Sequence, residues 1–178
     1  TGMNSDSVAE YVISSSLSLL KKTKLINEET QSGQWPRTSI TTNELKGKIL
    51  GLIGFGDIAK KVLKLINAFE VTTIAFDPFI NSQEMEEYNV KKVTFENILS
   101  LADIISIHVP LNNETKYLFD KKTFQKMNNK PIIINSSRGG IINETDILEA
   151  YKNNYISGFA LDVYEHEPVN KIFLKNIT

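Results

Sequence analysis

The stretch KILGLIGFGDIAKKV, residues 48–62, decides the fold that this sequence predicts. It opens as a short apolar run, which is typical of a buried strand, and it closes as a helical pattern with one apolar face. Between the two lies a G-x-G-x-x-A element. In it Gly54 allows a tight turn, Gly56 lets a phosphate approach the backbone, and Ala59 lets the helix pack closely on the strand. A third glycine, Gly51, lies inside the strand, where we expect a crossing element to pack closely; the alternative is that glycine at this position is incidental.

An acidic residue ends the next apolar run. The run VTTIAFD finishes at Asp77, where a carboxylate can accept hydrogen bonds from both ribose hydroxyls of NAD and would repel the 2′-phosphate of NADP. The strand-to-helix context and this acid together favour a dinucleotide site that prefers NAD. The alternative interpretation is a glycine-rich turn that binds no ligand.

Strand and helix patterns alternate from residue 45 to residue 163. The apolar runs are continuous rather than alternating, which indicates strands that are buried on both faces. We therefore predict an α/β fold, a doubly wound parallel sheet, over residues 45–163. Residues 1–44 are expected to form an interdomain helix at about 5–22 and a polar linker. Residues 164–178 are expected to start a return toward another part of a longer polypeptide.

Composition excludes several classes of protein. The 178 residues carry a formal net charge of −1, which gives no electrostatic case for binding nucleic acid or an anionic membrane. The sequence has no cysteine, which excludes disulfides, thiolate metal sites and thiol nucleophiles and suits a reducing cytoplasm. No apolar run approaches the roughly 18 residues that a membrane span needs. We therefore expect a globular protein without a metal site.

Two further strand ends carry residues suited to chemistry, because ligands of such sheets bind outside the carboxyl ends of the strands. His108, in SIHVPLNNETKYL, is either an acid–base group or a hydrogen-bonded part of the wall. Arg138, in IIINSSRGG, can grip a carboxylate with two parallel hydrogen bonds. The alternative for Arg138 is a guanidinium that satisfies nearby carbonyls or an ion pair.

An acidic segment, ALDVYEHEP, includes the end of the last predicted strand. We expect Asp162, Glu165 and Glu167 to cluster at the crevice, where an acid can orient a histidine and raise its pKa. The alternative is that these acids are solvated loop charges. His166, which lies among them, is interpreted as solvated surface.

Together these segments resemble the D-isomer-specific 2-hydroxyacid dehydrogenases, the family that includes phosphoglycerate, D-lactate, glycerate and formate dehydrogenases. The resemblance is carried by NSDSVAEYV, LKGKILGLIGFGDIAKKV, FDP, HVPLNNETKYL, INSSRGGIINETDIL and GFALDVYEHEP, which cover nearly the whole chain. It implies the NAD-binding Rossmann domain of an oxidoreductase that transfers hydride between C2 of a D-2-hydroxy acid and nicotinamide. The family's substrate lobe is missing from the sequence.

The resemblance also implies roles for single residues. Arg138 would hold the substrate carboxylate and keto oxygen, and Asp162 would hold the nicotinamide amide. Glu167 would pair with the catalytic histidine, which the family carries in a later Pro-His segment that this sequence does not reach. The other cofactor contacts would come from the turn, the ribose-binding acid and the cofactor wall: Gly54, Gly56, Asp57, Ile58, Asp77, Val109, Pro110, Thr115, Ser136, Ser137 and Arg138.

We further expect a cytoplasmic homodimer that acts on a small 2-hydroxy or 2-keto acid. The segment NSSRGG is similar to the phosphoglycerate type, which favours D-3-phosphoglycerate, although the side chains that choose the substrate lie largely in the missing lobe. Two alternatives are an NAD(H)-sensing regulator of the C-terminal-binding corepressor type and a nucleotide-binding module without chemistry of its own. By itself this sequence is expected to be catalytically inactive.

Overall fold

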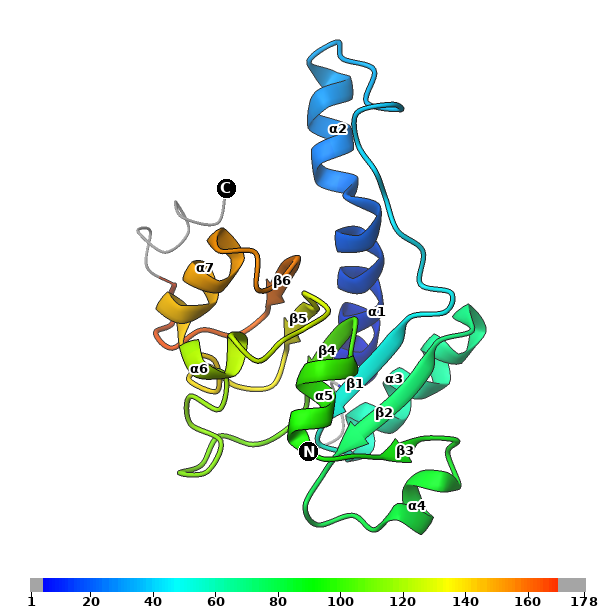
Figure 1. The fold of residues 1–178 in the computed structure, drawn as a ribbon, viewed down its shortest axis with the longest axis vertical. Coiled ribbons are helices and arrows are strands. Elements are labelled where there is room, and N and C mark those ends of the chain that lie inside the picture. The colour runs from blue at the N-terminus through cyan, green and yellow to red at the C-terminus, as the bar shows by residue number, and fades with distance from the viewer. Residues whose placement is uncertain (1–4, 170–178) are drawn as a thin grey trace.

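The computed structural model describes residues 5–169, which fold around a parallel sheet of six strands (Figure 1). The strands are β1 (Ile49–Ile53), β2 (Thr72–Phe76), β3 (Lys91–Lys92), β4 (Ile104–Ile107), β5 (Ile132–Asn135) and β6 (Gly158–Leu161). Every pair is parallel, and the order across the sheet is β3-β2-β1-β4-β5-β6. The direction of winding therefore reverses between β1 and β4. This arrangement confirms the predicted doubly wound sheet.

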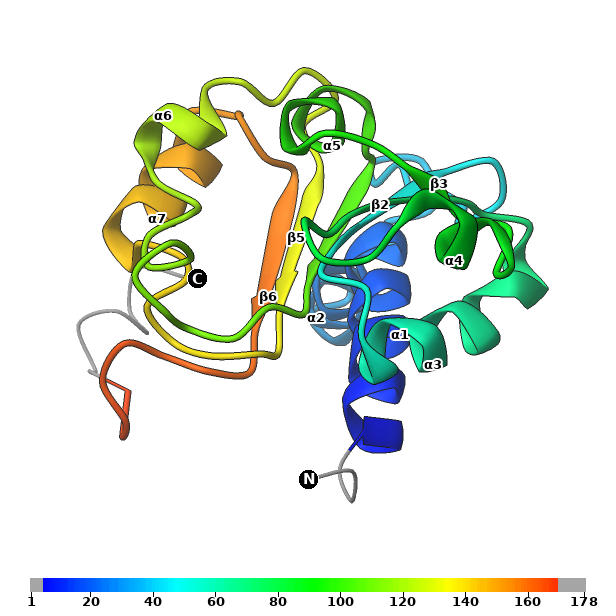
Figure 2. The same ribbon diagram turned by 90° about the horizontal axis from the view of Figure 1, so that it is seen from below.

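Helices cover both faces of the sheet (Figure 2). They are α1 (Ser5–Lys21), α3 (Asp57–Ile66), α4 (Ser82–Glu86), α5 (Phe95–Leu101), α6 (Lys121–Phe124) and α7 (Glu144–Lys152), with a 3-10 turn η1 (Asn67–Phe69) after α3. One apolar core joins the strands to α1, α3 and α4, and a second core joins them to α5, α6 and α7. The sheet is thus buried on both faces, as its continuous apolar strands predict.

The strand β1 lies at the centre of this packing. Successive side chains of a strand point to opposite faces, so Leu50 and Leu52 enter the first core and Ile53 enters the second. At Gly51 the helix α5 comes so close that a Cβ would lie 2.8 Å from Ile98 Cγ2 and 3.0 Å from Ala102 Cβ. The expected close packing of a crossing element at Gly51 is confirmed.

Residues 22–44 form an arm that projects from the sheet (Figure 1). We expected a polar linker here, and this is wrong in part because the arm begins with a helix, α2 (Thr23–Gln31). No residue of α2 is buried, and its only large apolar residues, Leu25 and Ile26, are adjacent in the sequence, which is not the spacing of an apolar helix stripe. Lys22 adopts a left-handed conformation with φ of 50°, which separates α2 from α1. Within residues 5–169, no helix combines the length and the apolar character that crossing a membrane requires.

Candidate nucleotide-binding site

The glycine-rich turn joins β1 to α3 at the carboxyl edge of the sheet, where the winding reverses. Gly54 has φ of +91°, and its N–H donates to the carbonyl of Phe76 at 2.9 Å. A Cβ at Gly54 would lie 2.8 Å from the carbonyl oxygen of His108, so the turn requires glycine there. Gly56 is extended, with φ of −86° and ψ of −166°, and a Cβ there would meet no atom within 4 Å. The space above Gly56, at the first turn of α3, is therefore open to a phosphate.

Phe55 anchors this turn from below, although it was not predicted as a site residue. Its ring is fully buried and meets the ring of Tyr88 edge-on, with centroids 5.7 Å apart. The ammonium group of Lys60 lies 5.0 Å from the Tyr88 ring centroid and forms an ion pair with Glu84 at 3.0 Å. An apolar residue between two turn glycines is the sequence signal that could have revealed this anchor.

Asp77 lies directly beside the turn, at the end of β2. Its Oδ2 accepts from the backbone N–H of Phe55 at 2.9 Å, and its Oδ1 accepts from the N–H groups of Phe79 and Ile80 at 2.8 and 3.3 Å. These bonds fix the carboxylate in place. Because an ionised carboxylate offers about four acceptor positions, Asp77 retains capacity for ribose hydroxyls.

His108 follows β4 and turns back along it. Its Nε2 lies 2.9 Å from Ser106 Oγ, and its Nδ1 is buried without a hydrogen-bond partner among the residues that the structure describes. Burial lowers the pKa of His108 to about 4, so the ring is uncharged at neutral pH. The geometry supports the interpretation of His108 as a hydrogen-bonded part of the wall over that of an acid–base group.

Acidification should destabilise the fold through this histidine. The pKa of His108 falls from its ordinary 6.5 to about 4 in the folded state, so the unfolded chain binds the proton more readily. The stabilisation is complete above pH 6.5 and disappears as the pH falls toward 4, with about 2 kcal/mol lost between pH 7 and pH 5. Urea unfolding of the wild type and His108→Asn at these two pH values checks this. An equal loss in both proteins would contradict it.

The segment after His108 carries three predicted cofactor contacts. Val109 lies over Gly54, because its Cγ1 would be 3.1 Å from a Cβ at that glycine. The hydroxyl of Thr115 donates to the carbonyl of Pro110 at 2.6 Å and accepts from the N–H of Asn112 at 2.8 Å. Thr115 thus holds the loop in shape, and Val109 lies nearest to the glycine turn.

The segment after β5 is organised by Asn135, a buried residue that was not predicted. Its Oδ1 accepts from the N–H and the hydroxyl of Ser137 at 3.1 and 2.8 Å, and its Nδ2 donates to the carbonyl of Arg138 at 3.0 Å. The signal for this role is the single polar residue that ends the run IIIN. Ser136 is only 8% exposed, and its Oγ has no partner among residues 5–169. Arg138 is exposed and donates from Nη1 to the carbonyl of Ser137 at 2.6 Å.

The segment after β6 carries the three acids that we expected to cluster. Asp162 is exposed, and its N–H donates to the carbonyl of Asn135 at 3.0 Å. Glu167 accepts from the N–H of Tyr164 at 3.2 Å. Glu165 instead reaches the first turn of α7, where its Oε1 accepts from the N–H of Glu144 at 2.9 Å. The expected cluster is therefore wrong for Glu165, whereas His166 is exposed as expected.

The predicted site residues come together at one edge of the sheet, from the ends of β1, β2, β4, β5 and β6. The open space at Gly56, the ten-residue helix α3 that starts there and the fixed carboxylate of Asp77 fit the pyrophosphate and ribose of a dinucleotide. His108 Nδ1 and Ser136 Oγ, which have no hydrogen-bond partner in the part of the chain that the structure describes, follow the strands β4 and β5. No group of three or more His, Asp or Glu side chains suited to a metal occurs within residues 5–169.

Comparisons with known proteins agree with this geometry. The family model described as the NAD binding domain of D-isomer specific 2-hydroxyacid dehydrogenases matches residues 13–176. D-3-phosphoglycerate dehydrogenase of Bacillus subtilis is 40% identical over 165 residues, which are 93% of this chain and 31% of that protein. (S)-Sulfolactate dehydrogenase of Chromohalobacter salexigens is 33% identical over 170 residues, which are 95% of this chain and 55% of that protein.

Solved structures show the same similarity in three dimensions. An NAD-dependent formate dehydrogenase from Staphylococcus aureus, crystallised in complex with NAD, matches with a TM-score of 0.91 and 32% identity. The match covers 99% of this chain and 54% of that one. D-lactate dehydrogenase with NAD+ from Lactobacillus jensenii matches with a TM-score of 0.84 and 29% identity, over 95% of this chain and 54% of that one. The chain thus spans between about a third and about half of the length of the proteins that it matches.

Proposed function

Because the chain belongs to the family of D-isomer specific 2-hydroxyacid dehydrogenases and matches their NAD-binding domain, we propose that it is the cofactor domain of an NAD-dependent oxidoreductase of small D-2-hydroxy acids. The observation that carries this proposal is the convergence of the open turn at Gly56, the fixed carboxylate of Asp77 and the exposed guanidinium of Arg138 at one edge of the sheet. The division of the chain at residues 44/45 and 163/164 stays a prediction.

The turn and Asp77 would hold the adenosine half of the cofactor. The backbone at Gly56, Asp57 and Ile58 starts α3, and the first N–H groups of a helix have no partner within the helix. These N–H groups and the helix dipole favour the negative charge of a pyrophosphate. Asp77 would accept the ribose hydroxyls while keeping its bond to Phe55.

The remaining strand ends would hold the nicotinamide half and the substrate. Asp162 would accept from the nicotinamide amide, and the cofactor wall would consist of Val109, Pro110, Thr115, Ser136 and Ser137. Arg138 would bind the substrate carboxylate with two parallel hydrogen bonds and stabilise charge on the reacting oxygen. NAD, when bound, supplies the hydride acceptor. Glu167 would orient a histidine from outside these 178 residues, which would take the hydroxyl proton.

The similarity to phosphoglycerate dehydrogenases makes D-3-phosphoglycerate the first substrate to test. The complete dehydrogenase that contains this domain should oxidise D-3-phosphoglycerate with NAD, as followed by the absorbance of NADH. Turnover of another D-2-hydroxy acid would keep the enzyme class and change the substrate. Binding of NADH without turnover of any such acid would support a cofactor-sensing regulator or a binding module instead.

Asp77 should give the chain a preference for NADH over NADPH. Loss of a hydrogen bond to a charged group costs about 1.5–3 kcal/mol, which corresponds to roughly ten- to a hundredfold in affinity. Titration calorimetry of the chain should show that NADH binds more tightly than NADPH by about this factor. Asp77→Ala should reduce the difference between the two affinities, because it removes both the acceptor for the ribose hydroxyls and the repulsion of the 2′-phosphate. Asp77→Asn is the matched control that keeps the shape and one acceptor. Equal or tighter binding of NADPH to the wild type would contradict the role of Asp77.

We also propose that the protein is a cytoplasmic homodimer. The arm offers an apolar surface for a second copy, because Trp35 is 75% exposed and lines a hollow of about 370 Å³ with Ile26, Pro36 and Ile40. Sedimentation of the wild type and of Trp35→Ser tests this proposal. A monomeric wild type would contradict it.

A further inference from the structure

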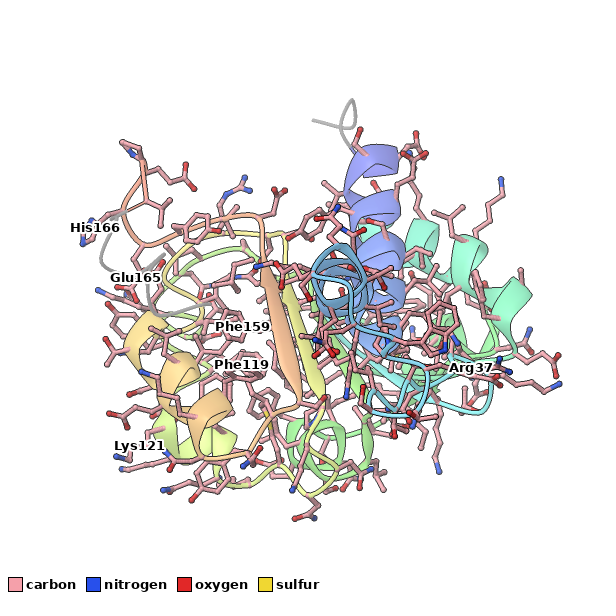
Figure 3. The ribbon with its side chains drawn as sticks, turned by 90° about the horizontal axis from the view of Figure 1, so that it is seen from above. Arg37, Phe119, Lys121, Phe159, Glu165 and His166 are labelled. Carbon is pink, nitrogen blue, oxygen red and sulfur yellow. The ribbon has the colours of Figure 1, made fainter. Side chains whose placement is uncertain are left out.

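One carboxylate ties together three segments that follow different strands. Glu165 Oε1 accepts from the N–H of Glu144 at 2.9 Å, and Glu165 Oε2 accepts from the hydroxyl of Tyr117 at 2.9 Å. In return, the N–H of Glu165 donates to Oε1 of Glu144 at 2.6 Å. Figure 3 shows Glu165 beside one end of α7, with Lys121 near the other end. We call Glu165, Glu144 and Tyr117 the latch.

Backbone contacts hold the same three segments together around the latch. The N–H of Tyr117 donates to the carbonyl of Gly140 at 2.8 Å. A Cβ on Gly139 would lie only 1.8 Å from the carbonyl oxygen of Tyr164, so the segments after β5 and β6 are in direct contact there. The latch therefore lies where the segments after β4, β5 and β6 meet.

The chemistry of the latch explains why two glutamates lie side by side. Like charges at close range repel, and each carboxylate needs a compensating donor. Glu144 and Glu165 each accept the backbone N–H of the other, at the N-terminus of α7 where the helix dipole favours negative charge. The reciprocal pattern is that of a capping box, built here between residues of two separate segments.

Tyr117 is the third residue of the latch, and its backbone conformation also indicates that its surroundings hold it in place. Its φ of 50° lies in the left-handed region, which is unfavourable for a tyrosine and persists only where the surroundings determine it. The hydrogen bond to Glu165 raises the pKa of the Tyr117 hydroxyl above its usual 10.0. The side chain and the backbone N–H thus both hold Tyr117 in this conformation.

From these contacts we propose that Glu165 is a positioning residue for the nicotinamide end of the site. It holds the segment that carries Asp162 and Glu167 against α7 and against the segment that carries Thr115. This inference rests on the proposed function, in which Asp162 and Glu167 act at the nicotinamide and at the catalytic histidine. Both carboxylate oxygens of Glu165 already accept from Glu144 and Tyr117, so in this proposal Glu165 touches neither cofactor nor substrate.

A comparison of NADH binding with ADP-ribose binding separates a positioning role at the nicotinamide end from a general effect on the fold or on the whole cofactor site. ADP-ribose has the groups that meet the glycine turn and Asp77 but lacks the nicotinamide. By calorimetry, Glu165→Ala should weaken NADH binding by about tenfold, the cost of roughly one hydrogen bond to a charged group, and should leave ADP-ribose binding nearly unchanged. Glu165→Gln should recover most of the NADH affinity, because an amide can accept from Glu144 and donate to Tyr117. Glu149→Ala, which removes an α7 carboxylate outside the latch, should match the wild type.

A second measurement keeps the test decisive if Glu165→Ala folds poorly. Tyr117→Phe removes one contact of the latch and leaves Glu144 paired with Glu165, so it should weaken NADH binding less than Glu165→Ala and again spare ADP-ribose. NMR titration of Tyr117 should show a lower pKa in Glu165→Gln than in the wild type, because the charged acceptor is gone.

The possible failures are distinguishable. If Glu165→Ala weakens ADP-ribose as much as NADH, or weakens neither, the positioning role is wrong while the proposed function stands. An unchanged pKa of Tyr117 in Glu165→Gln would likewise overturn the latch. If the wild type binds neither NADH nor ADP-ribose, the proposed function is wrong, and the role of Glu165 at a nicotinamide site fails with it.

Discussion

Gly56→Val should abolish measurable NADH binding and leave the fold intact. The two added methyl groups would fill the space above the first turn of α3, where a Cβ at Gly56 meets no atom within 4 Å. The backbone there is extended, with φ of −86°, so valine fits without strain. The pyrophosphate would lose its approach to the helix N-terminus, and we expect affinity to fall by at least about a hundredfold, or roughly 3 kcal/mol.

Gly54, in the same turn, provides the contrast, because a substitution there should reduce the stability of the fold. At Gly54 a Cβ would lie 2.8 Å from the carbonyl oxygen of His108, and φ is +91°. Gly54→Ala should therefore destabilise the fold by about 1–2 kcal/mol from the backbone conformation alone, with the contact adding to it. Calorimetry and circular dichroism of both variants test the pair. A folded Gly56→Val protein with unchanged NADH affinity would place the phosphate site elsewhere.

Arg138→Lys should lower kcat/KM of the complete dehydrogenase by roughly ten- to a hundredfold, because the loss of a charge-assisted hydrogen bond costs about 1.5–3 kcal/mol. Lysine keeps the charge but cannot form two parallel hydrogen bonds to a carboxylate. Arg138 is exposed, and its guanidinium donates to the neighbouring carbonyl of Ser137. NADH affinity should therefore change little.

His108→Asn is the control for this assignment. The ring of His108 is bonded to Ser106, and burial lowers its pKa to about 4. The variant should act through the cofactor wall and leave the pH dependence of kcat/KM in place. If His108→Asn removed the pH dependence of kcat/KM and Arg138→Lys left kcat/KM nearly unchanged, His108 would be the acid–base group and the role given to Arg138 would be wrong.

The features that could be predicted from the sequence are those that local periodicity or a strand end determines. Continuous apolar runs indicated strands buried on both faces, and G-x-G-x-x-A placed the turn between β1 and α3. Asp77 could be predicted to lie beside the glycine turn, because the carboxyl ends of neighbouring parallel strands meet at the same edge of the sheet. The close approach at Gly51 was predicted from a glycine inside a strand, and the structure confirms it because an added Cβ has no room there.

The features that could not be predicted depend on contacts between distant segments. Nothing local distinguishes Glu165 from Glu167 in YEHEP, and only the fold brings Glu165 to the N–H of Glu144. Phe55 packs on Tyr88, which follows α4, and a contact between such distant residues leaves no period of two or 3.6 in the sequence. The helix α2 was not predicted because its nine residues include only two large apolar side chains, Leu25 and Ile26, which are adjacent and do not form a helix stripe.

The contact between Gly139 and Tyr164 limits how this protein can evolve. A side chain at position 139 would meet the carbonyl oxygen of Tyr164 at 1.8 Å, so any other residue type would part the segments after β5 and β6. An insertion or deletion beside Arg138 would break the same contact and shift the guanidinium. Arg138 is therefore held in register by its neighbour. In the proposed function, a change of substrate preference would therefore come from replacement of other side chains at the site and not from movement of Arg138.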